Sequence, residues 1–333
     1  MDTLIWGFMK FLILKTTDPY RNLATEEYLF RNCLDDVFML WQNEPTVVIG
    51  KNQNAAAEIN RAYLDERGIH IARRITGGGA VYHDLGNLNY TFISGSRAGG
   101  GLDFAYFTSP IIEALGSVGV AATLTGRNDL AIDGRKFSGN AQHEADGRVL
   151  HHGTLLFDSD LDALSSVLTV DPAKIQSKGV KSTRSRVTNL APYLPSGWGI
   201  GELISLIAGF VEKRFSPEVI DAPEGEEIER LYRKYSSDEW IFPALGIAAS
   251  HTVKKKRRYP FGTVELLLDI KGEKIQGAKI VGDFFGFSDT GELEAALVGI
   301  RLSEVAERLS GLDTDKYISG MTEKELTELI LSD

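Results

Sequence analysis

The chain has 333 residues, more than a single hydrophobic core usually accommodates, so we expect one large domain and a smaller one. Its hydrophobic content of 43% and charged content of 25% are ordinary for a soluble globular protein, and its formal net charge of −10 argues against non-specific nucleic-acid binding as the main role. Cys33 is the only cysteine, which excludes an intrachain disulfide framework and a thiolate zinc site and fits a reducing cytoplasm.

The N-terminal segment from Leu4 to Leu14 is mostly apolar. It is too short to span a bilayer, carries Lys10 in its middle and is not preceded by a basic segment, so we expect neither a membrane span nor a secretion signal. We interpret residues 11–14 as a buried strand. Whether residues 1–8 belong to the functional protein is left open.

Helical spacing and capping residues mark the next elements. Asn54 and Asp103 are typical N-cap residues, and Gly68 is a typical C-cap residue. The expected helices cover residues 22–32, 54–68, 103–118, 161–168 and 200–215. β-forming residues predict strands at 47–49, at 153–157, and between 71 and 93, where glycine-bearing turns interrupt them at 77–79 and 85–87.

A boundary is expected between Phe242 and Tyr259, where a proline and several small residues precede the basic run Lys254–Arg258. In an acidic chain we interpret that run as a solvated turn and not as a nucleic-acid patch. Beyond it, strands are expected at residues 262–270 and 274–280, and helices at 292–298, 302–309 and 322–331. The predicted organisation is a catalytic domain over residues 1–246, a linker over 247–258, and a small α/β domain over 259–333.

The densest motif runs from Arg73 to Asn87 and reads Arg-Arg-Ile-Thr-Gly-Gly-Gly-Ala-Val-Tyr-His-Asp-Leu-Gly-Asn. Its three successive glycines lack Cβ atoms, so a ligand can approach their backbone N–H groups. Arg73 and Arg74 are suited to pair with phosphate or carboxylate oxygens. The segment matches neither common nucleotide-binding glycine motif. We interpret it as a ligand loop in preference to a glycine bend on a solvated strand.

A second motif, over residues 126–141, contains Asp133-Gly134 between β-forming residues, which indicates a two-residue hairpin turn. The turn predicts four cross-strand pairs, namely Ile132 with Arg135, Ala131 with Lys136, Leu130 with Phe137, and Asp129 with Ser138. Alternation then places Leu130, Ile132 and Phe137 on an apolar face, and Asp129, Ala131, Lys136 and Ser138 on a polar one. Such a polar face is either a ligand site or an ordinary solvated surface.

Two further features bear on the site. His151 and His152 are adjacent on a predicted strand and therefore point to opposite faces, so a hydrogen-bonding role for one of them is favoured over metal ligation. Four basic residues enrich the segment before Asn189, where they either bind phosphate or are merely solvated; they are Lys178, Lys181, Arg184 and Arg186.

Together these segments resemble the lipoate–protein ligase family. Residues 73–87 look like its glycine-rich signature, 126–141 like its lysine motif, and 152–157 like the strand that follows. Residues 178–189 are similar too, as are residues 259–286 through their Gly-Asp-Phe-Phe-Gly sequence. The similarity keeps its order from about Phe11 to the end. It implies an α+β catalytic domain of the class shared with biotin–protein ligases, a mixed β-sheet flanked by helices, together with a small C-terminal α/β domain.

The resemblance implies a two-step reaction in the cytoplasm. Lipoate attacks the α-phosphate of ATP to give lipoyl-adenylate and pyrophosphate, and a lysine of an acceptor protein then displaces AMP. The implied acceptors are lipoyl domains of 2-oxo-acid dehydrogenase acyltransferase subunits or the glycine-cleavage H protein, and neither nucleic acid nor membrane is an expected partner. ATP with Mg²⁺ and lipoate are expected as substrates, and no tightly bound cofactor is expected.

The resemblance also assigns residues. Lys136 becomes the central catalytic lysine, placed between the carboxylate and the α-phosphate. The ATP-contacting positions are Arg74, Gly79, Ala80, Val81, Tyr82, Lys136 and Asp129, and Asp129 is also the candidate group for orienting Mg²⁺. The lipoate-contacting positions are Gly77, Gly78, Asn87, His83, Lys136, Ser138 and His152. The walls of an apolar tunnel for the acyl tail are not assigned.

Three alternatives stay open. An octanoyl transferase would need a cysteine acyl-enzyme, but Cys33 lies in a predicted helix away from every site motif. A lipoyltransferase would accept preformed lipoyl-nucleotide without making it, and a lipoate carrier built on the same fold would have no activity at all. The sequence also leaves open the preferred acceptor, the oligomeric state, and the choice between lipoate and octanoate, since an apolar slot distinguishes them weakly.

Overall fold

The computed structural model describes residues 8–96, 102–167, 186–243 and 252–332. These residues divide into two compact units. Unit 1 contains the described residues of Met1–Val48, Asn60–Ala72 and Val81–Ser236. Unit 2 contains those of Ile49–Ile59, Arg73–Ala80 and Ser237–Asp333. Two short segments of the N-terminal half therefore belong to the same unit as the C-terminal part.

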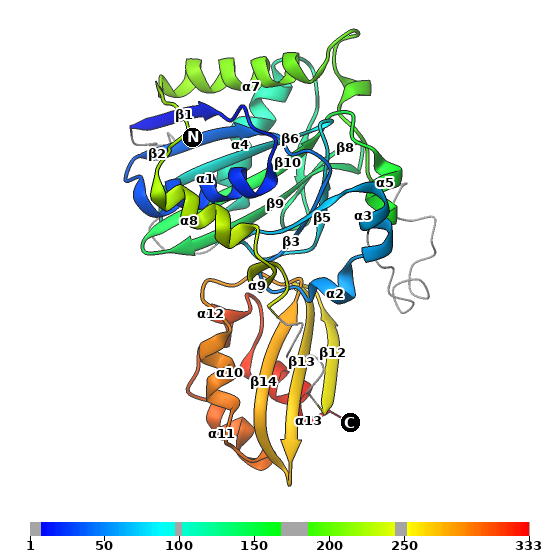
Figure 1. Ribbon diagram of the computed structural model, residues 1–333, viewed down its shortest axis with the longest axis vertical. Coiled ribbons are helices and arrows are strands. Elements are labelled where there is room, and N and C mark those ends of the chain that lie inside the picture. The colour runs from blue at the N-terminus through cyan, green and yellow to red at the C-terminus, as the bar shows by residue number, and fades with distance from the viewer. Residues whose placement is uncertain (1–7, 97–101, 168–185, 244–251, 333) are drawn as a thin grey trace. The chain divides into compact units, whose positions relative to one another are not determined.

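Unit 1 is built on an eight-stranded sheet in the order β11-β1-β2-β6-β10-β9-β8-β7 (Figure 1). Its strands are β1 (Met9–Ile13), β2 (Asp36–Trp41), β6 (Asn87–Gly95), β7 (Thr123–Thr125), β8 (Asp129–Ile132), β9 (Arg135–Ala145), β10 (Arg148–Leu156) and β11 (Glu218–Val219). β1 pairs in parallel with β2 and β11, and the other pairs are antiparallel. A second sheet has the order β4-β3-β5, from β3 (Thr46–Ile49), β4 (His70–Arg73) and β5 (Val81–His83). The mixed sheet expected from the sequence is confirmed.

Unit 1 also contains six α-helices among its described residues. They are α1 (Pro19–Asn32), α3 (Arg61–Arg67), α4 (Phe104–Gly116), α5 (Leu161–Ser166), α7 (Ile200–Phe215) and α8 (Glu226–Tyr235), with a 3₁₀ turn η2 (Ala191–Tyr193). α4 and α7 pack against each other and against a core that includes Phe92, Phe107 and Leu203. α1 packs on α8 and on strands β6 and β10. The expected helix at 200–215 is confirmed, as is the Asp103 cap, whose Oδ1 accepts from the Tyr106 N–H at 2.9 Å.

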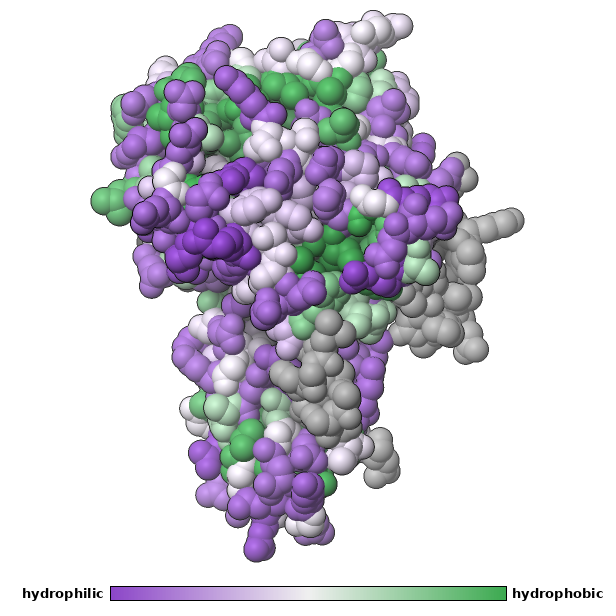
Figure 2. Space-filling view, viewed as in Figure 1, coloured by the Kyte–Doolittle hydropathy of each residue, from purple (hydrophilic) through white to green (hydrophobic). Residues whose placement is uncertain are grey.

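Hydrophobic residues show between hydrophilic ones on the surface over α7 (Figure 2). On α7, half-buried Ile204, Leu206 and Phe210 pack against the core. Among the helices of the described residues, none is long and apolar enough to cross a membrane.

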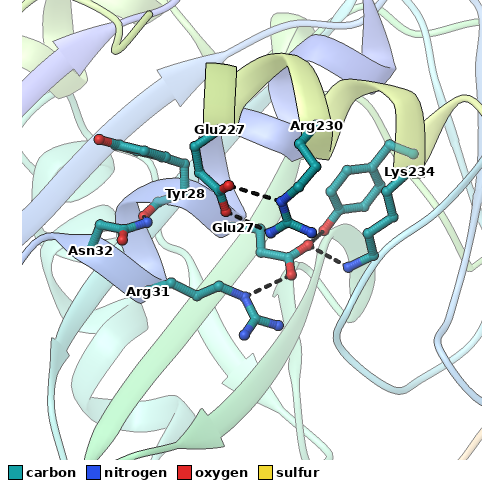
Figure 3. Close-up of polar contacts among 8 residues, drawn as sticks. Glu27, Tyr28, Arg31, Asn32, Glu227, Arg230 and Lys234 are labelled. Atoms are coloured by element: carbon teal, nitrogen blue, oxygen red, sulfur yellow. Dashed lines mark hydrogen bonds and ion pairs between the residues drawn. The ribbon is translucent and has the colours of Figure 1, made fainter. Parts of the chain in front are cut away.

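Buried Glu27 ties α1 to α8 (Figure 3). Its carboxylate accepts from Lys234 Nζ at 2.6 Å, from the Tyr235 hydroxyl at 2.6 Å and from Arg31 Nε at 2.8 Å. Burial alone would raise the pKa of Glu27, but the attraction and hydrogen bonds of Lys234, with those of Tyr235 and Arg31, outweigh it and hold the pKa below its usual value. The ionised form of Glu27 is therefore the one that stabilises the fold.

We expect Glu27→Gln to lower the free energy of unfolding at pH 7 by roughly 2 kcal/mol, because it leaves the partly buried Lys234 without its counter-charge. Since the folded pKa is depressed, this contribution is present above the unfolded value and is lost as the pH falls through the folded one. Urea denaturation at pH 7 and pH 4 should therefore show the variant and the wild type converging in acid. Glu227→Gln is the matched control, because its ion pair with Arg230 is exposed, and it should change nothing measurable.

Unit 2 has its own sheet and core. The sheet is antiparallel, with β12 (Val253–Tyr259), β13 (Gly262–Lys271) and β14 (Lys274–Gly282) in that order. The helices are α2 (Ala55–Glu58), α9 (Asp238–Ile241), α10 (Gly291–Leu297), α11 (Val305–Leu309), α12 (Thr314–Tyr317) and α13 (Glu323–Leu331), with a 3₁₀ turn η3 (Leu302–Glu304). Val264, Leu266 and Phe284 lie in a core that α10, α11 and α13 cover.

Two local expectations are wrong. The run Lys254–Arg258 is not a turn but most of the edge strand β12, in which side chains alternate between exposed and half-buried and Lys254 pairs with Glu265. Lysine-rich edge strands resist pairing with other chains, so a basic run is compatible with a strand. The helix expected over 54–68 breaks at Ile59, because Asn60 caps a new helix by accepting from the Tyr63 N–H.

Candidate functional site

The predicted hairpin is present in unit 1. Asp133 and Gly134 both have positive φ, 51° and 71°, as the two central residues of a type I′ hairpin turn require. Ile132 pairs with Arg135, and Ala131 pairs with Lys136, so these two predicted pairs are confirmed.

The other two predicted pairs are wrong. A β-bulge between Leu130 and Ala131 shifts the register, so Leu130 pairs with Ser138 and Asp129 pairs with Gly139. One extra residue in a strand exchanges its two faces. Ser138 consequently lies on the core face, where it is fully buried and accepts from Asn140 Nδ2 at 3.3 Å, and it does not join the polar face of Lys136.

The polar face of the hairpin is centred on Lys136. Its Nζ lies 2.7 Å from Asp129 Oδ1, and both side chains are about one-third exposed, at 38% and 36%. A Cβ added to Gly139 would lie 2.9 Å from the same Nζ, so glycine there leaves the space that the lysine uses. The Lys136 backbone pairs with residues 186–188, donating to Arg186 and accepting from Thr188. Lys136 is thus fixed at its backbone while its charged end stays accessible.

A row of residues continues this face across the sheet. Gly139 donates to Thr154 Oγ1 at 3.1 Å, and Thr154 pairs in register with Asn89 on β6. Asn87 Nδ2 donates to Asn89 Oδ1 at 2.9 Å, yet Asn87 Oδ1 and Asn89 Nδ2 are buried with no hydrogen-bond partner in the described part of the chain. Buried amide groups are nearly always satisfied, so these two atoms favour a polar ligand. Asn87 was expected at the site. Asn89 was missed, although two-residue alternation from Asn87 indicates it.

His152 lies on the same face and is held by a buried carboxylate. Its Nδ1 is 2.9 Å from Glu26 Oε1 on α1, and the same oxygen accepts from Thr91 Oγ1 at 2.7 Å. Thr91 in turn accepts from Trp41 Nε1 at 3.0 Å. Glu26 is 1% exposed and was missed by the sequence analysis, because only folding brings α1 over β10.

His151 points the opposite way, as expected. Its ring stacks on Phe107 at 5.2 Å, and burial lowers its pKa well below the usual value, so it is neutral. On β5, buried His83 has its Nδ1 3.0 Å from Asn43 Nδ2. Tyr82 is also buried there, and burial raises its pKa to about 12, while Val81 is half-buried.

The glycine loop belongs to unit 2, where Arg74 organises it. The Arg74 side chain is 5% exposed. Its Nε donates to Thr76 Oγ1 at 2.8 Å, and its Nη2 donates to the carbonyls of Gly77 at 2.7 Å and Gly79 at 2.8 Å. These bonds turn loop carbonyls toward the guanidinium. Gly79 is exposed with open space around it, and Ala80 is half-exposed, so their N–H groups lie at the accessible end of the loop.

Arg73 has a different role from the one expected. Within the described ranges its guanidinium donates only to backbone carbonyls, those of Gly50, Lys51, Gln53, Trp240 and Ile241, at 2.7 to 3.0 Å. The side chain is 1% exposed, and burial lowers its pKa to about 10, so it stays charged at neutral pH. Arg73 therefore joins three chain segments and is not directed at a ligand.

The predicted site residues thus fall into two groups, each within its own unit. Those in unit 1 are Val81, Tyr82, His83, Asn87, Asp129, Lys136, Ser138 and His152, and those in unit 2 are Arg74, Gly77, Gly78, Gly79 and Ala80. Lys178, Lys181 and Arg184 lie outside the described residues. No cluster of three or more metal-ligating side chains occurs among the described residues.

Two family models match the chain. The lipoyl protein ligase A/B catalytic domain matches residues 18–211, and the bacterial lipoate protein ligase C-terminus matches residues 248–330. The chain is 40% identical over 326 residues to lipoate-protein ligase LplJ of Bacillus subtilis (strain 168), with coverage of 94% of this chain and 97% of that protein. It is also 40% identical over 321 residues to lipoate–protein ligase 1 of Staphylococcus aureus, again over 94% and 97%.

Solved structures share the fold. P. falciparum LipL1 in complex with lipoate matches 98% of this chain and 99% of its own, with a TM-score of 0.80 at 22% identity. A lipoate-protein ligase A bound with ATP matches 72% of this chain and 100% of its own, with a TM-score of 0.59 at 27% identity. The first of these structures was solved with lipoate and the second with ATP.

Proposed function

Since the chain belongs to the lipoate–protein ligase family, we propose that it activates lipoate with ATP and transfers the lipoyl group to a lysine of a lipoyl-domain protein. The observation that carries the proposal is Lys136, a partly exposed lysine held by Asp129 on the polar face of the bulged hairpin. Its position combines a fixed backbone with an accessible positive charge.

In the first step a lipoate carboxylate oxygen attacks the α-phosphorus of ATP. The bond from that phosphorus to the bridging oxygen breaks, and pyrophosphate leaves with the electron pair. Negative charge grows on oxygens at the reacting centre, and a cation already in place stabilises it more in the transition state than in the ground state. We assign this role to Lys136, which exchanges its contact with Asp129 for the carboxylate and the α-phosphate.

ATP binding is assigned to the glycine loop and to β5. Arg74 holds the loop carbonyls, which leaves the N–H groups of Gly79 and Ala80 for phosphate oxygens. Val81 and Tyr82 follow directly and are assigned to the nucleotide. Mg²⁺ usually takes one or two carboxylates together with phosphates, and Asp129 fits as one such ligand. The ion would offset charge on the departing pyrophosphate.

Lipoate binding is assigned to the polar face that Lys136 shares with β6 and β10. Asn87 Oδ1 and Asn89 Nδ2 are buried without a partner among the described residues, and Glu26 orients His152 on the same face. In the second step the acceptor's ε-amino nitrogen attacks the lipoyl carbonyl carbon, the bond to the AMP oxygen breaks, and the amine gives up a proton. Acceptors among the lipoyl domains of 2-oxo-acid dehydrogenases and the H protein are proposed without a preference.

Lipoate-dependent exchange of labelled pyrophosphate into ATP tests the proposal. Exchange that requires both lipoate and Mg²⁺, followed by lipoylation of an added lipoyl domain, is the expected result. A well-folded protein that transfers from preformed lipoyl-adenylate without exchange would be a lipoyltransferase. One that binds lipoate and does neither would be a carrier. Octanoate in parallel assays measures how weakly the acyl slot distinguishes the two acids.

A further inference from the structure

Within unit 2, the glycine loop is packed against the Gly-Asp-Phe-Phe-Gly segment, residues 282–286. The Gly78 N–H donates to the Phe284 carbonyl at 3.1 Å. A Cβ added to Gly77 would lie 2.4 Å from that same carbonyl oxygen, a distance that no real side chain tolerates. The first two glycines are therefore needed so that the backbone of residues 284–285 can approach the loop.

The Phe285 ring completes this contact. The ring is 1% exposed, and its Cε1 and Cζ lie 3.1 Å from where a Gly78 Cβ would be. Arg74 Nη2 lies 3.1 Å from the same point, so the ring and the guanidinium both fill the space that a Gly78 side chain would need. Gly78 also has a φ of 91°, in the region that favours glycine. The loop conformation thus depends on Phe285 as well as on Arg74.

The segment that presents Phe285 is itself firmly held. Gly282 donates to the Asn52 carbonyl at 2.8 Å, and Ser319 donates to the Phe285 carbonyl at 2.8 Å. Phe284 is fully buried in the core of unit 2. Nearby, Lys51 and Asp289 form an ion pair of 3.0 Å. A side chain fixed in this way can hold its neighbour in one conformation.

These contacts use one of the loop's N–H donors and two of its carbonyls. The Phe284 carbonyl accepts from the Gly78 N–H, and Arg74 donates to the carbonyls of Gly77 and Gly79. The N–H groups of Gly79 and Ala80 then remain at the accessible end. If the Phe285 ring is lost, Gly78 gains room to rotate, and those two donors lose their fixed direction.

We propose that Phe285 is a positioning residue for adenylation: it acts through Gly78 to hold the glycine loop in the conformation that binds the ATP phosphates. The proposal rests on the function proposed above. Because lipoyl-adenylate lacks the β- and γ-phosphates, the second step depends less on this loop. Phe285 should therefore matter for making the adenylate and much less for using it.

Phe285→Leu in the full-length protein tests this, because leucine keeps a buried apolar side chain but removes the flat ring. We expect pyrophosphate exchange to fall by about 10- to 100-fold with a raised KM for ATP, since a small misplacement of binding groups is costly. Transfer from preformed lipoyl-adenylate should stay within about threefold of wild type. Phe261→Leu is the matched control, because that ring stacks on Tyr259 at 5.0 Å and also lies against Gly320.

Gly78→Ala changes the same contact on the loop side. It should lower pyrophosphate exchange as Phe285→Leu does, and adding Phe285→Leu to it should cause little further loss of exchange, because the two residues act through one contact. Denaturation curves confirm that each variant is folded. Equal losses of both partial reactions in Phe285→Leu, or unchanged exchange, would overturn the proposal. Absence of exchange in the wild type would instead reject the proposed function.

Discussion

Lys136→Ala is expected to lower lipoate-dependent pyrophosphate exchange by about 10²- to 10³-fold while the protein remains folded. The magnitude is that of removing one group that stabilises charge developing in a transition state. Stability should change little, because the side chain is 38% exposed and its ion pair with Asp129 is similarly exposed. The measurement is exchange of labelled pyrophosphate under saturating ATP and lipoate.

The neighbouring Arg135 provides the control. Arg135 pairs with Ile132, is exposed, and lies on the hairpin side opposite to Lys136, so Arg135→Ala should retain exchange within about threefold. Lys136→Arg keeps the charge, but its larger planar group cannot occupy the space beside Gly139, and we expect it to be inactive as well. Exchange in Lys136→Ala within tenfold of wild type would contradict the central role of this lysine.

Arg73→Leu is expected to be the most destabilising single substitution among the predicted motif residues, lowering the free energy of unfolding by about 3–5 kcal/mol. The change leaves the buried carbonyls of two chain segments, one with Gly50 and Gln53 and one with Ile241, without their common donor. Guanidinium chloride denaturation measures the effect. Any loss of ligand binding should be indirect, because the Arg73 guanidinium is buried against backbone carbonyls.

Two variants make that test specific. Arg73→Lys retains the charge but has fewer N–H donors and lacks the planar guanidinium. Its free energy of unfolding should therefore lie between those of Arg73→Leu and the wild type. Arg61→Leu removes an exposed arginine that pairs with exposed Asp65, and its effect should be unmeasurable. A loss below about 1 kcal/mol in Arg73→Leu would show that water satisfies those carbonyls and would refute the structural role.

The sequence alone was sufficient to predict the elements whose structure depends on residues close together in the chain. Asp133-Gly134 identifies its own hairpin because few residues adopt positive φ there, and Asp103 identifies a helix start because its side chain reaches an N–H three residues on. Lys136 was singled out from the hairpin motif and from family resemblance. The mixed sheet followed from that same resemblance, and the small C-terminal α/β unit followed from the boundary before Tyr259 and from the strand and helix patterns after it. The fold contains both.

The tertiary structure alone decided which partners those residues meet. A bulge moved Ser138 to the core face, a shift that alternation cannot reveal because it requires knowing where one residue is skipped. The two arginines look equivalent in sequence, yet Arg73 joins distant backbone segments while Arg74 shapes the glycine loop. The three glycines of the loop predict only that another group, from the protein or from a ligand, approaches the loop backbone closely. That Phe284 and Phe285 approach them depends on packing between segments some 200 residues apart, which no local pattern encodes.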